Sequence, residues 1–386
     1  MVRASRYDVI IIGAGINGAG IARDAAMRGL KILLIDKGEP GCATTSASTR
    51  LIHGGLRYLE HFEFGLVRES LRERETLLKI APHLVKPLGI TIPIYKQSRR
   101  GRLTIRAGMI LYDLLSWDKS LPRHQMLSRS ETLDRWPGLN PEGLVGSALY
   151  YDAQVEFPER LVLENVKSAR AFGAEVLTHT RVTNLVVEDG KVSSVEFQDQ
   201  FVEADVVINA AGPWIDQVLT PVKSPKLIGG TKGSHIVVAP FPGAPANAIY
   251  LEARSDGRPM FIIPWNKLYL IGTTDVRFEG DPDKVRCEDW EIDYLLSETN
   301  LALPAAQLTH DSILQTYSGV RPLAYQSSTR RHFIREHPQL PNLLSIVGGK
   351  LTTYRSLAEE CVDLIFRKLG KDPPPCNTDK IGFQSV

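Results

Sequence analysis

The sequence predicts an α/β fold of two domains, in which an α+β domain on a mixed sheet is inserted into a domain with a parallel sheet. Two stretches and the chain length support this prediction. "YDVIIIGAGINGAGIARDAAMRGLKILLID" reads as strand, glycine-rich turn, helix and strand, and "ADVVINAAG" adds an all-apolar strand much later. The 386 residues, 43% of them hydrophobic, exceed the size of most single domains and can bury a large core.

The first stretch is a complete βαβ unit of Rossmann type. In order, it comprises a strand at 9–12, a turn with Gly13, Gly15 and Gly18, a helix at 19–28, and a strand at 31–35. Asp36 comes 18 residues after Gly18, where a dinucleotide fingerprint has the carboxylate for a ribose hydroxyl. Gly15 lets the backbone approach a pyrophosphate, whose charge then lies at the positive end of the helix. The unit therefore predicts a dinucleotide site.

The rest of the chain indicates a discontinuous nucleotide domain. A helix, a strand and a hairpin turned at Asp189-Gly190 lead to the second apolar strand, which ends in small residues. Shorter strands, many prolines and a hairpin candidate at Asn266-Lys267 mark the inserted parts. The predicted organisation is a nucleotide domain of 1–81, 151–221 and 301–375, a substrate domain of 82–150 and 222–300, and a tail of 376–386.

Composition excludes several classes of protein. The net charge of +2 argues against nucleic-acid binding through bulk charge. The four cysteines are far apart and lack C-x-x-C spacing, so neither a disulfide framework nor a zinc site is expected, and no other metal site is indicated. The chain shows no signal peptide and no segment apolar enough to cross a bilayer. We expect a cytoplasmic protein, or one attached to the membrane from the cytoplasmic side.

The segment after the βαβ unit decides between NAD and FAD. "GCATTSASTRLIHGGLRYLEH" comes next, in place of an uninterrupted doubly wound sheet, and it is dense in hydroxyl side chains. Hydroxyl and backbone N–H groups at this density suit a pyrophosphate and a polar ring system. A Ser/Thr-rich surface loop is the alternative, but it does not explain why His53 and Arg57 bracket a pair of glycines. The segment favours FAD.

Six motifs then occur in a fixed order, "GAGINGAGIARDAAMRGL", "CATTSASTRLIHGGLRYLEH", "KGSHIVV", "IGTTD", "YSGVRPL" and "VGGKLTTYR". In them the chain resembles the FAD-dependent, quinone-linked glycerol-3-phosphate dehydrogenases over nearly all of 6–375. The resemblance implies a Rossmann-like FAD-binding domain with an inserted mixed-sheet substrate domain, as in D-amino-acid oxidase. It also implies oxidation of sn-glycerol 3-phosphate to dihydroxyacetone phosphate, with electrons passing from FAD to a quinone or another acceptor. Longer members carry a C-terminal helical domain, which we expect this chain to lack.

Cofactor contacts are expected from the glycine turn, the hydroxyl-rich segment and the later small-residue motifs. The candidates are Gly13, Gly15, Asn17, Gly18, Asp36, Lys37, Thr45, Ser46, Ser48, Arg50, His53, Gly54, Val182, Ala211, Gly212, Gly319, Gly349, Lys350, Leu351 and Thr352.

Oxidation of a secondary alcohol requires a base for the hydroxyl proton, and histidine is the usual side chain for this role. Two of the nine histidines lie in the shared motifs, His53 and His235. We favour His235 as the base, because it lies on an extended segment of the substrate domain, and we expect His53 to contact the flavin ring. Each histidine has a purely structural role as its alternative.

A substrate phosphate requires guanidinium or ammonium groups. Arg57, Arg321 and Lys350 are the main candidates, with Arg321 also counted among the catalytic residues. Tyr58 stands beside Arg57 and adds a phenol. Three weaker candidates for the same pocket are Lys232, Thr274 and Asp275.

The segment 96–129 indicates a membrane contact. It holds eight Lys or Arg and two Asp, a local charge of +6. Its apolar residues fall on one helical stripe, namely Leu103, Ala107, Ile110, Leu111, Leu114 and Trp117. Such a helix can lie in an anionic interface, where a quinone is met. The alternative is that Ile110 and its neighbours pack on the substrate domain.

Two other functions stay open on the sequence alone. One is a flavin oxidase of another small hydroxy or amino acid, which needs fewer cations than Arg57, Arg321 and Lys350 provide. The other is a flavoprotein without turnover. The subunit number is not fixed by the sequence, and a homodimer is compatible with it.

Overall fold

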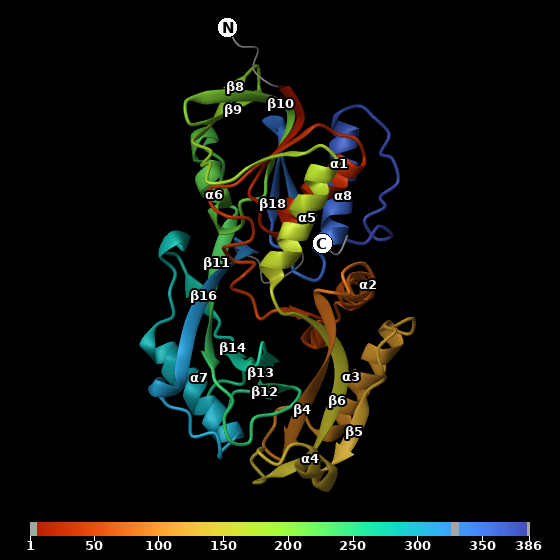
Figure 1. Cartoon of the computed structure of the whole chain (residues 1–386), viewed down its shortest axis with the longest axis vertical. Coiled ribbons are helices and arrows are strands. Elements are labelled where there is room, and N and C mark those ends of the chain that lie inside the picture. Colours follow the sequence, from red (N-terminus) through yellow and green to blue (C-terminus); the bar gives the residue numbers. More distant parts are fainter. Residues whose placement is uncertain (1–5, 326–331, 384–386) are drawn as a thin grey trace.

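The computed structural model describes residues 6–325 and 332–383, so the first five residues, 326–331 and the last three residues of the expected tail 376–386 lie outside the described part. Two large β-sheets organise it, one in the upper half of Figure 1 and one in the lower half. The upper sheet has the order β17-β18-β10-β1-β2-β7, with β8 and β9 beside β10. The lower sheet has the order β15-β11-β14-β13-β12-β4-β6-β3, with β16 on β11 and β5 on β6.

The strands of the upper sheet are β1 (Arg6–Ile12), β2 (Ile32–Ile35), β7 (Glu175–Leu177), β8 (Asn184–Glu188), β9 (Lys191–Phe197), β10 (Gln200–Asn209), β17 (Phe333–His337) and β18 (Leu340–Val347). Those of the lower sheet are β3 (Leu51–Ile52), β4 (Val85–Tyr95), β5 (Gln125–Ser128), β6 (Leu144–Val155), β11 (Ile228–Val238), β12 (Ala248–Glu252), β13 (Pro259–Trp265), β14 (Leu268–Gly272), β15 (Val276–Phe278) and β16 (Ile313–Ala324). The α-helices are α1 (Ile16–Met27), α2 (Phe64–Ile80), α3 (Arg102–Leu115), α4 (Arg129–Arg135), α5 (Pro158–Ala171), α6 (Ile215–Val218), α7 (Asp289–Ala302) and α8 (Tyr354–Lys368).

The upper sheet places β1 at its centre, between β2 and β10 and parallel to both. Both of its faces are covered, because α1, α5 and α8 pack on one side and the β8–β9 hairpin with α6 on the other. Val9, Ile10 and Ile11 are therefore all fully buried, which explains why β1 reads as a continuous apolar run. The carboxyl ends of β1 and β10 lie side by side, and the two small-residue motifs meet there.

The lower sheet is mostly antiparallel, with long β4–β6 and β11–β16 pairs and one parallel pair, β12–β4. Helix α7 covers one face, and α2 and α3 cover part of the other. This sheet includes segments that the prediction assigns to the nucleotide domain. The predicted nucleotide domain includes residues 301–324, but β16 pairs with β11 along its whole length. That pairing joins segments about 85 residues apart, so local pattern did not indicate it. Strand β3 and residues 151–155 of β6 are two further such segments, and the domain boundaries stay predictions.

Both predicted hairpins are confirmed. Asp189 and Gly190 connect β8 to β9 with φ of 49° and 72°, and Asn266 and Lys267 connect β13 to β14 with φ of 48° and 62°. Two successive residues with positive φ are the mark of a type I′ turn, whose twist matches that of the flanking strands.

Helix α3 has apolar residues on two faces. Ile105, Met109 and Tyr112 are buried against the lower sheet. The predicted stripe lies on the outside, where Leu103 is 81% and Trp117 76% exposed. Leu111 is half-buried and the rest of the stripe is exposed, with Ile110 at 45%, while the neighbouring Met109 and Tyr112 are the residues that pack on the substrate domain. In the described part of the chain, no helix is both long and apolar enough to span a bilayer.

Candidate functional site

A cavity of about 1320 Å³ lies between the two sheets. Its wall comes from the β1–α1 turn, the segment 36–58, the ends of β10 and β18, and the facing strands β11 and β16. This volume exceeds the 300–1,000 Å³ or so of a typical small-molecule pocket. The cavity can therefore hold a large ligand together with a small one.

The glycine turn after β1 forms one end of the cavity. Gly13 has a φ of +106°, and a Cβ there would come within 2.6 Å of the Ala210 carbonyl oxygen. A Cβ on Gly18 would come within 1.8 Å of the Gly13 oxygen, so Gly18 packs the helix on the turn and does not line the cavity. At Gly15, by contrast, the nearest atom is Thr45 Oγ1 at 3.7 Å. Gly15 therefore leaves space for a ligand against the backbone.

The first turn of α1 presents its amide groups to this space. The helix has no side-chain cap at Gly15 and no acidic residue in its first turn, and Thr45 Oγ1 accepts from the Ile16 N–H at 3.2 Å. The Asn17 side chain donates to the Gly348 carbonyl at 3.2 Å and thereby holds the 348–349 turn against the helix. The positive end of the helix faces the cavity and suits an anion.

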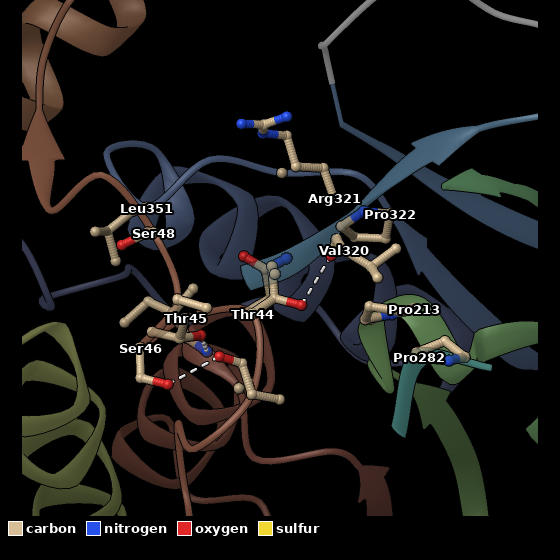
Figure 2. Close-up of a pocket in the computed structure, with 18 of the residues that line it drawn as sticks. Thr44, Thr45, Ser46, Ser48, Pro213, Pro282, Val320, Arg321, Pro322 and Leu351 are labelled. Carbon is tan, nitrogen blue, oxygen red and sulfur yellow. Dashed lines mark hydrogen bonds between the residues drawn. The ribbon is translucent and has the colours of Figure 1, made fainter. Parts of the chain in front are cut away.

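Asp36 and Lys37 come directly after β2 at the same end. The Asp36 carboxylate accepts from the Ala14 N–H at 2.5 Å and from the Gly38 N–H at 2.8 Å, and burial raises its pKa against the effect of those donors. Lys37 Nζ pairs with Asp283 at 2.5 Å and lies 3.7 Å from the centre of the Trp214 ring. Lys37 thus links the two short helices at Gly212–Trp214 and Pro282–Lys284, whose prolines appear together in Figure 2.

The hydroxyl-rich segment forms a side wall and not a surface loop. Thr44 Oγ1 donates to the Val320 carbonyl at 2.9 Å and so joins the segment to β16, as Figure 2 shows. Ser46 Oγ donates to the Cys42 and Ala43 carbonyls, and Ser48 Oγ accepts from the Arg50 N–H at 3.3 Å. The hydroxyl groups mostly satisfy their own backbone, which fixes the shape of the wall.

His235 lies on β11 at the other end of the cavity. Its Nε2 is 3.0 Å from Thr49 Oγ1, and its ring stacks on Tyr317 at a centroid distance of 4.9 Å. Only 1% of the residue is exposed, and its Nδ1 has no hydrogen-bond partner among the described residues. Burial, followed by the positive charges of Arg321 and Arg50, lowers the pKa of His235 to about 3. The imidazole is therefore neutral at pH 7.

Arg321 lies on β16 beside this histidine. Its Nη1 donates to Asp275 Oδ1 and its Nη2 to Thr273 Oγ1, both at 2.9 Å. A Cβ on Gly233 would come within 2.2 Å of Nη2. The lack of a side chain at Gly233 therefore leaves the space that the guanidinium group occupies. In Figure 2 the side chain of Arg321 projects from the strand above Thr44.

Lys350, Tyr58 and Arg57 also line the cavity. The ammonium nitrogen of Lys350 lies 3.8 Å from the centre of the Tyr58 ring, a cation–π contact. Arg57 is more exposed than the other two residues. Lys350, Arg57 and Arg321 thus give the cavity lining three cationic side chains.

The structure brings most of the predicted site residues to this cavity. The predicted residues that line it are Gly13, Gly15, Asn17, Asp36, Lys37, Thr45, Ser46, Ser48, Arg50, His53, Arg57, Tyr58, Val182, Ala211, Gly212, His235, Asp275, Gly319, Arg321, Gly349, Lys350, Leu351 and Thr352. The roles assigned to them stay predictions at this point.

Lys232 and Thr274 do not line the cavity. Lys232 Nζ pairs with Glu291 at 2.7 Å, and Thr274 Oγ1 donates to the other oxygen of that carboxylate at 2.7 Å. Side chains alternate along β11, so Gly233 and His235 face the cavity while Lys232 faces the buried Glu291. Their prediction as substrate contacts is wrong. Gly54 also lies outside the cavity wall, packed against α3.

Sequence reasoning missed several residues of the site. Thr49 and Tyr317 contact His235, and Arg258 lines the cavity near Asp275. Thr49 and Tyr317 stand inside the shared motifs, a signal that could have identified them. Arg258 stands in no motif. In the described residues, no group of three His, Cys, Asp or Glu side chains has the placement to hold a metal ion.

Known proteins share both the sequence and the fold of this chain. Residues 8–361 match the sequence profile of the FAD dependent oxidoreductase family. Over 98% of this chain, identity is 52% to a glycerol-3-phosphate dehydrogenase of Synechocystis sp. and 34% to an aerobic glycerol-3-phosphate dehydrogenase of Staphylococcus aureus, covering 73% and 71% of those proteins. The crystal structure of the glycerol-3-phosphate dehydrogenase from Bacillus halodurans complexed with FAD superposes with a TM-score of 0.80, at 31% identity over 98% of this chain and 67% of that one. These matches confirm the predicted fold class.

Proposed function

Because the chain belongs to the FAD-dependent oxidoreductases, in the family of glycerol-3-phosphate dehydrogenases, we propose that it oxidises sn-glycerol 3-phosphate to dihydroxyacetone phosphate with FAD as cofactor. One observation carries the proposal. A single cavity has a dinucleotide turn at one end and, at the other, a neutral histidine beside a guanidinium group. The first end suits the cofactor and the second suits an anionic alcohol.

The cavity residues fit FAD. The open space at Gly15 and the first-turn amides of α1 would hold the pyrophosphate, and the Asp36 carboxylate would hold the ribose. His53, Lys350 and the 348–349 turn also line this cavity and would contact the ring system. When bound, FAD supplies the acceptor for the hydride that leaves the substrate carbon.

The three cationic side chains of the cavity lining, Arg321, Lys350 and Arg57, would hold the substrate phosphate. Arg321 presents a planar guanidinium, and Lys350 and Arg57 add two further positive charges. Charge-assisted contacts to a phosphate are about twice as strong as neutral hydrogen bonds. Asp275 offsets part of the charge of Arg321, so the arginine is oriented before substrate arrives.

His235 is the proposed proton acceptor. Its low pKa, to which the charge of Arg321 contributes, makes it a weak base before substrate binds. A dianionic phosphate bound at Arg321 would offset that positive charge and strengthen the basicity of His235 when the substrate hydroxyl is in place. His53 is the second candidate, because it lines the same cavity and is less buried.

The pH profile distinguishes the two histidines. With His235 as the base, the only acid-side loss of kcat/KM between pH 8 and pH 5 should come from the substrate phosphate, whose second pKa is about 6, because the free enzyme binds no proton at His235 in that range. If kcat/KM shows an acid limb within that range and this limb disappears in His53→Asn, His53 is the base.

We extend the proposal to the electron acceptor, a quinone reached at the surface of an anionic membrane. The exposed stripe of α3 and the +6 charge of residues 96–129 support it. The protein should co-sediment with anionic vesicles at low salt and less so at high salt. Leu114→Glu should weaken this binding about tenfold, because burying one leucine contributes about 1.5–3 kcal/mol. The control is Leu163→Glu on α5, which is also exposed. If both variants bind the anionic vesicles equally, or if the wild type does not bind them, the proposed membrane contact is wrong.

Turnover assays test the function. The protein with FAD, sn-glycerol 3-phosphate and an artificial electron acceptor should form dihydroxyacetone phosphate. Glycine, proline and D-amino acids serve as comparison substrates, because they would be the ones oxidised if the chain were an amino-acid oxidase. Preference for any of them over glycerol 3-phosphate would reject the proposal.

A further inference from the structure

A buried phenol links helix α3 to the turn that carries His53. Tyr112 is 2% exposed and lies on the inner face of α3. Its hydroxyl group accepts from the Gly54 N–H at 2.9 Å and donates to the Asp152 carboxylate, whose nearer oxygen is 2.8 Å away. Asp152 lies on β6 and is itself fully buried. One side chain thus joins three separate segments of the chain.

At the end of this connection farther from the cavity, Asp152 is held by an ion pair. Arg74 of α2 donates to Asp152 at 2.6 Å and to the Tyr151 carbonyl at 3.2 Å, and it has no exposed surface. The buried Asp152 carboxylate is paired with both Tyr112 and Arg74. This arrangement is strongly favoured, because loss of either partner would leave a buried charge or dipole without compensation. Burial, together with the Asp152 charge, raises the pKa of Tyr112 well above its usual value. The phenol therefore stays protonated and keeps the same hydrogen-bond directions.

The near end of the connection holds the backbone beside the cavity. His53 is fixed on its own side by Thr352, whose hydroxyl accepts from the His53 N–H at 3.1 Å. Gly54, the next residue, is fixed by Tyr112. A Cβ at Gly54 would come within 2.5 Å of the phenol oxygen and 2.7 Å of Leu71, so the turn has no freedom to move toward α3. The His53 side chain lies in the cavity wall between these two anchors.

We propose that Tyr112 is a positioning residue of the enzyme: its hydroxyl fixes the backbone at Gly54 and thereby sets where His53 lies against the flavin and the substrate. The inference rests on the proposed function, because it assigns His53 to that site. Tyr112 does not line the cavity. Its contribution is geometric, and a displacement of about 1 Å at a reacting centre costs up to 100-fold in rate.

Tyr112→Phe in the full-length protein with bound FAD is the direct test. The substitution keeps the ring and its packing and removes the hydroxyl group. The turnover number should fall about tenfold, KM for glycerol 3-phosphate should change less than twofold, and the visible spectrum of the flavin should shift. The drop should vanish when the same substitution is made in His53→Asn, because a residue that acts through His53 has no effect without it.

The matched control is Ser116→Ala. Ser116 also lies next to Tyr112 on the buried side of α3, at its C-terminal end, and its hydroxyl donates to the Tyr112 carbonyl at 2.8 Å. Losing this bond should lower stability as Tyr112→Phe does, yet leave the kinetic constants and the spectrum unchanged. If both variants slow turnover equally, or if Tyr112→Phe slows it equally with and without His53, Tyr112 is merely structural.

Hydrogen exchange in the wild-type holoenzyme provides a second test that needs no variant. The Gly54 amide should exchange slowly, because it is buried and bonded to the phenol. Rapid exchange at Gly54 would contradict the inference even if Tyr112→Phe failed to fold. A wild-type protein that binds FAD but does not oxidise glycerol 3-phosphate would instead reject the proposed function, so the two failures are distinguishable.

Discussion

The two ends of the cavity are built in different ways. The dinucleotide end is made of backbone, with Gly13, Gly15 and the first amides of α1 in one continuous stretch. The substrate end is made of side chains, with His235 from β11 and Arg321 from β16. Backbone is placed by local turn geometry, whereas each side chain at the substrate end needs its own partner, such as Thr49 or Asp275. A substitution at the dinucleotide end should therefore change the space for the ligand or the stability of the fold. A substitution at the substrate end should change the charge that holds the substrate.

The largest effect is expected at Gly13. Gly13→Ala places a Cβ against the Ala210 carbonyl and forces an L-residue to a φ of +106°. Strain and overpacking each cost about 1–3 kcal/mol, so we expect a loss of about 3 kcal/mol in the free energy of unfolding. Urea denaturation of the FAD-free protein measures it.

Gly15→Ala is the matched variant for this end. The added methyl group meets no backbone, since its nearest neighbour is 3.7 Å away, but it occupies the space proposed for the pyrophosphate. The free energy of unfolding should change by less than about 1 kcal/mol, while the Kd for FAD should rise at least tenfold. Normal FAD binding by Gly15→Ala would contradict the placement of the cofactor.

At the substrate end, Arg321→Ala should raise KM for glycerol 3-phosphate about 100-fold. A hydrogen bond to a charged group contributes about 1.5–3 kcal/mol, and about 1.4 kcal/mol corresponds to a factor of ten. Binding of FAD should be unchanged, which separates this end from the other. Arg277→Ala, an exposed arginine on the neighbouring β15, is the control and should keep the wild-type KM. A near-normal KM in Arg321→Ala would refute the phosphate site.

A smaller effect is expected in the pH dependence of stability. The pKa of His235 is about 3 in the folded chain and about 6.5 in the unfolded chain, so between these values the unfolded chain binds a proton that the folded chain does not. Stability should therefore fall as pH falls from about 6.5 toward 3, by up to about 1.4 kcal/mol per pH unit from this residue. Denaturation at pH 7 and pH 5 measures it.

His235→Asn should reduce that loss between pH 7 and pH 5, whereas His83→Asn, at an exposed position, should retain it. An identical loss in the wild type and in His235→Asn would show that the histidine is not held neutral by the fold.

The difference between the two ends also explains how much the sequence could reveal. The helix predicted at 19–28 is α1 at Ile16–Met27, because glycine spacing and apolar periodicity are local signals. The prediction puts Lys232 on the wrong side of its strand, because a shift of one residue exchanges the two faces of a sheet. The partners of Arg321 and His235 come from segments that only the fold brings together.

Helix α3 shows a further limit of pattern reasoning. The stripe from Leu103 to Trp117 is apolar as predicted, but a second apolar face, with Met109 and Tyr112, is the one that packs on the protein. When a helix has two apolar faces, periodicity alone does not show which of them packs on the protein. The link from Tyr112 to Gly54 was invisible in the sequence for a related reason, since it crosses 58 residues.

Anaerobic titration of the FAD-loaded protein with sn-glycerol 3-phosphate tests the central claim most directly. Both ends of the cavity must be occupied at once for the flavin to be reduced. We predict that about one equivalent of glycerol 3-phosphate bleaches the visible flavin band and yields an equal amount of dihydroxyacetone phosphate. A flavin band that persists at saturating glycerol 3-phosphate, or a protein that retains no FAD, would contradict the account.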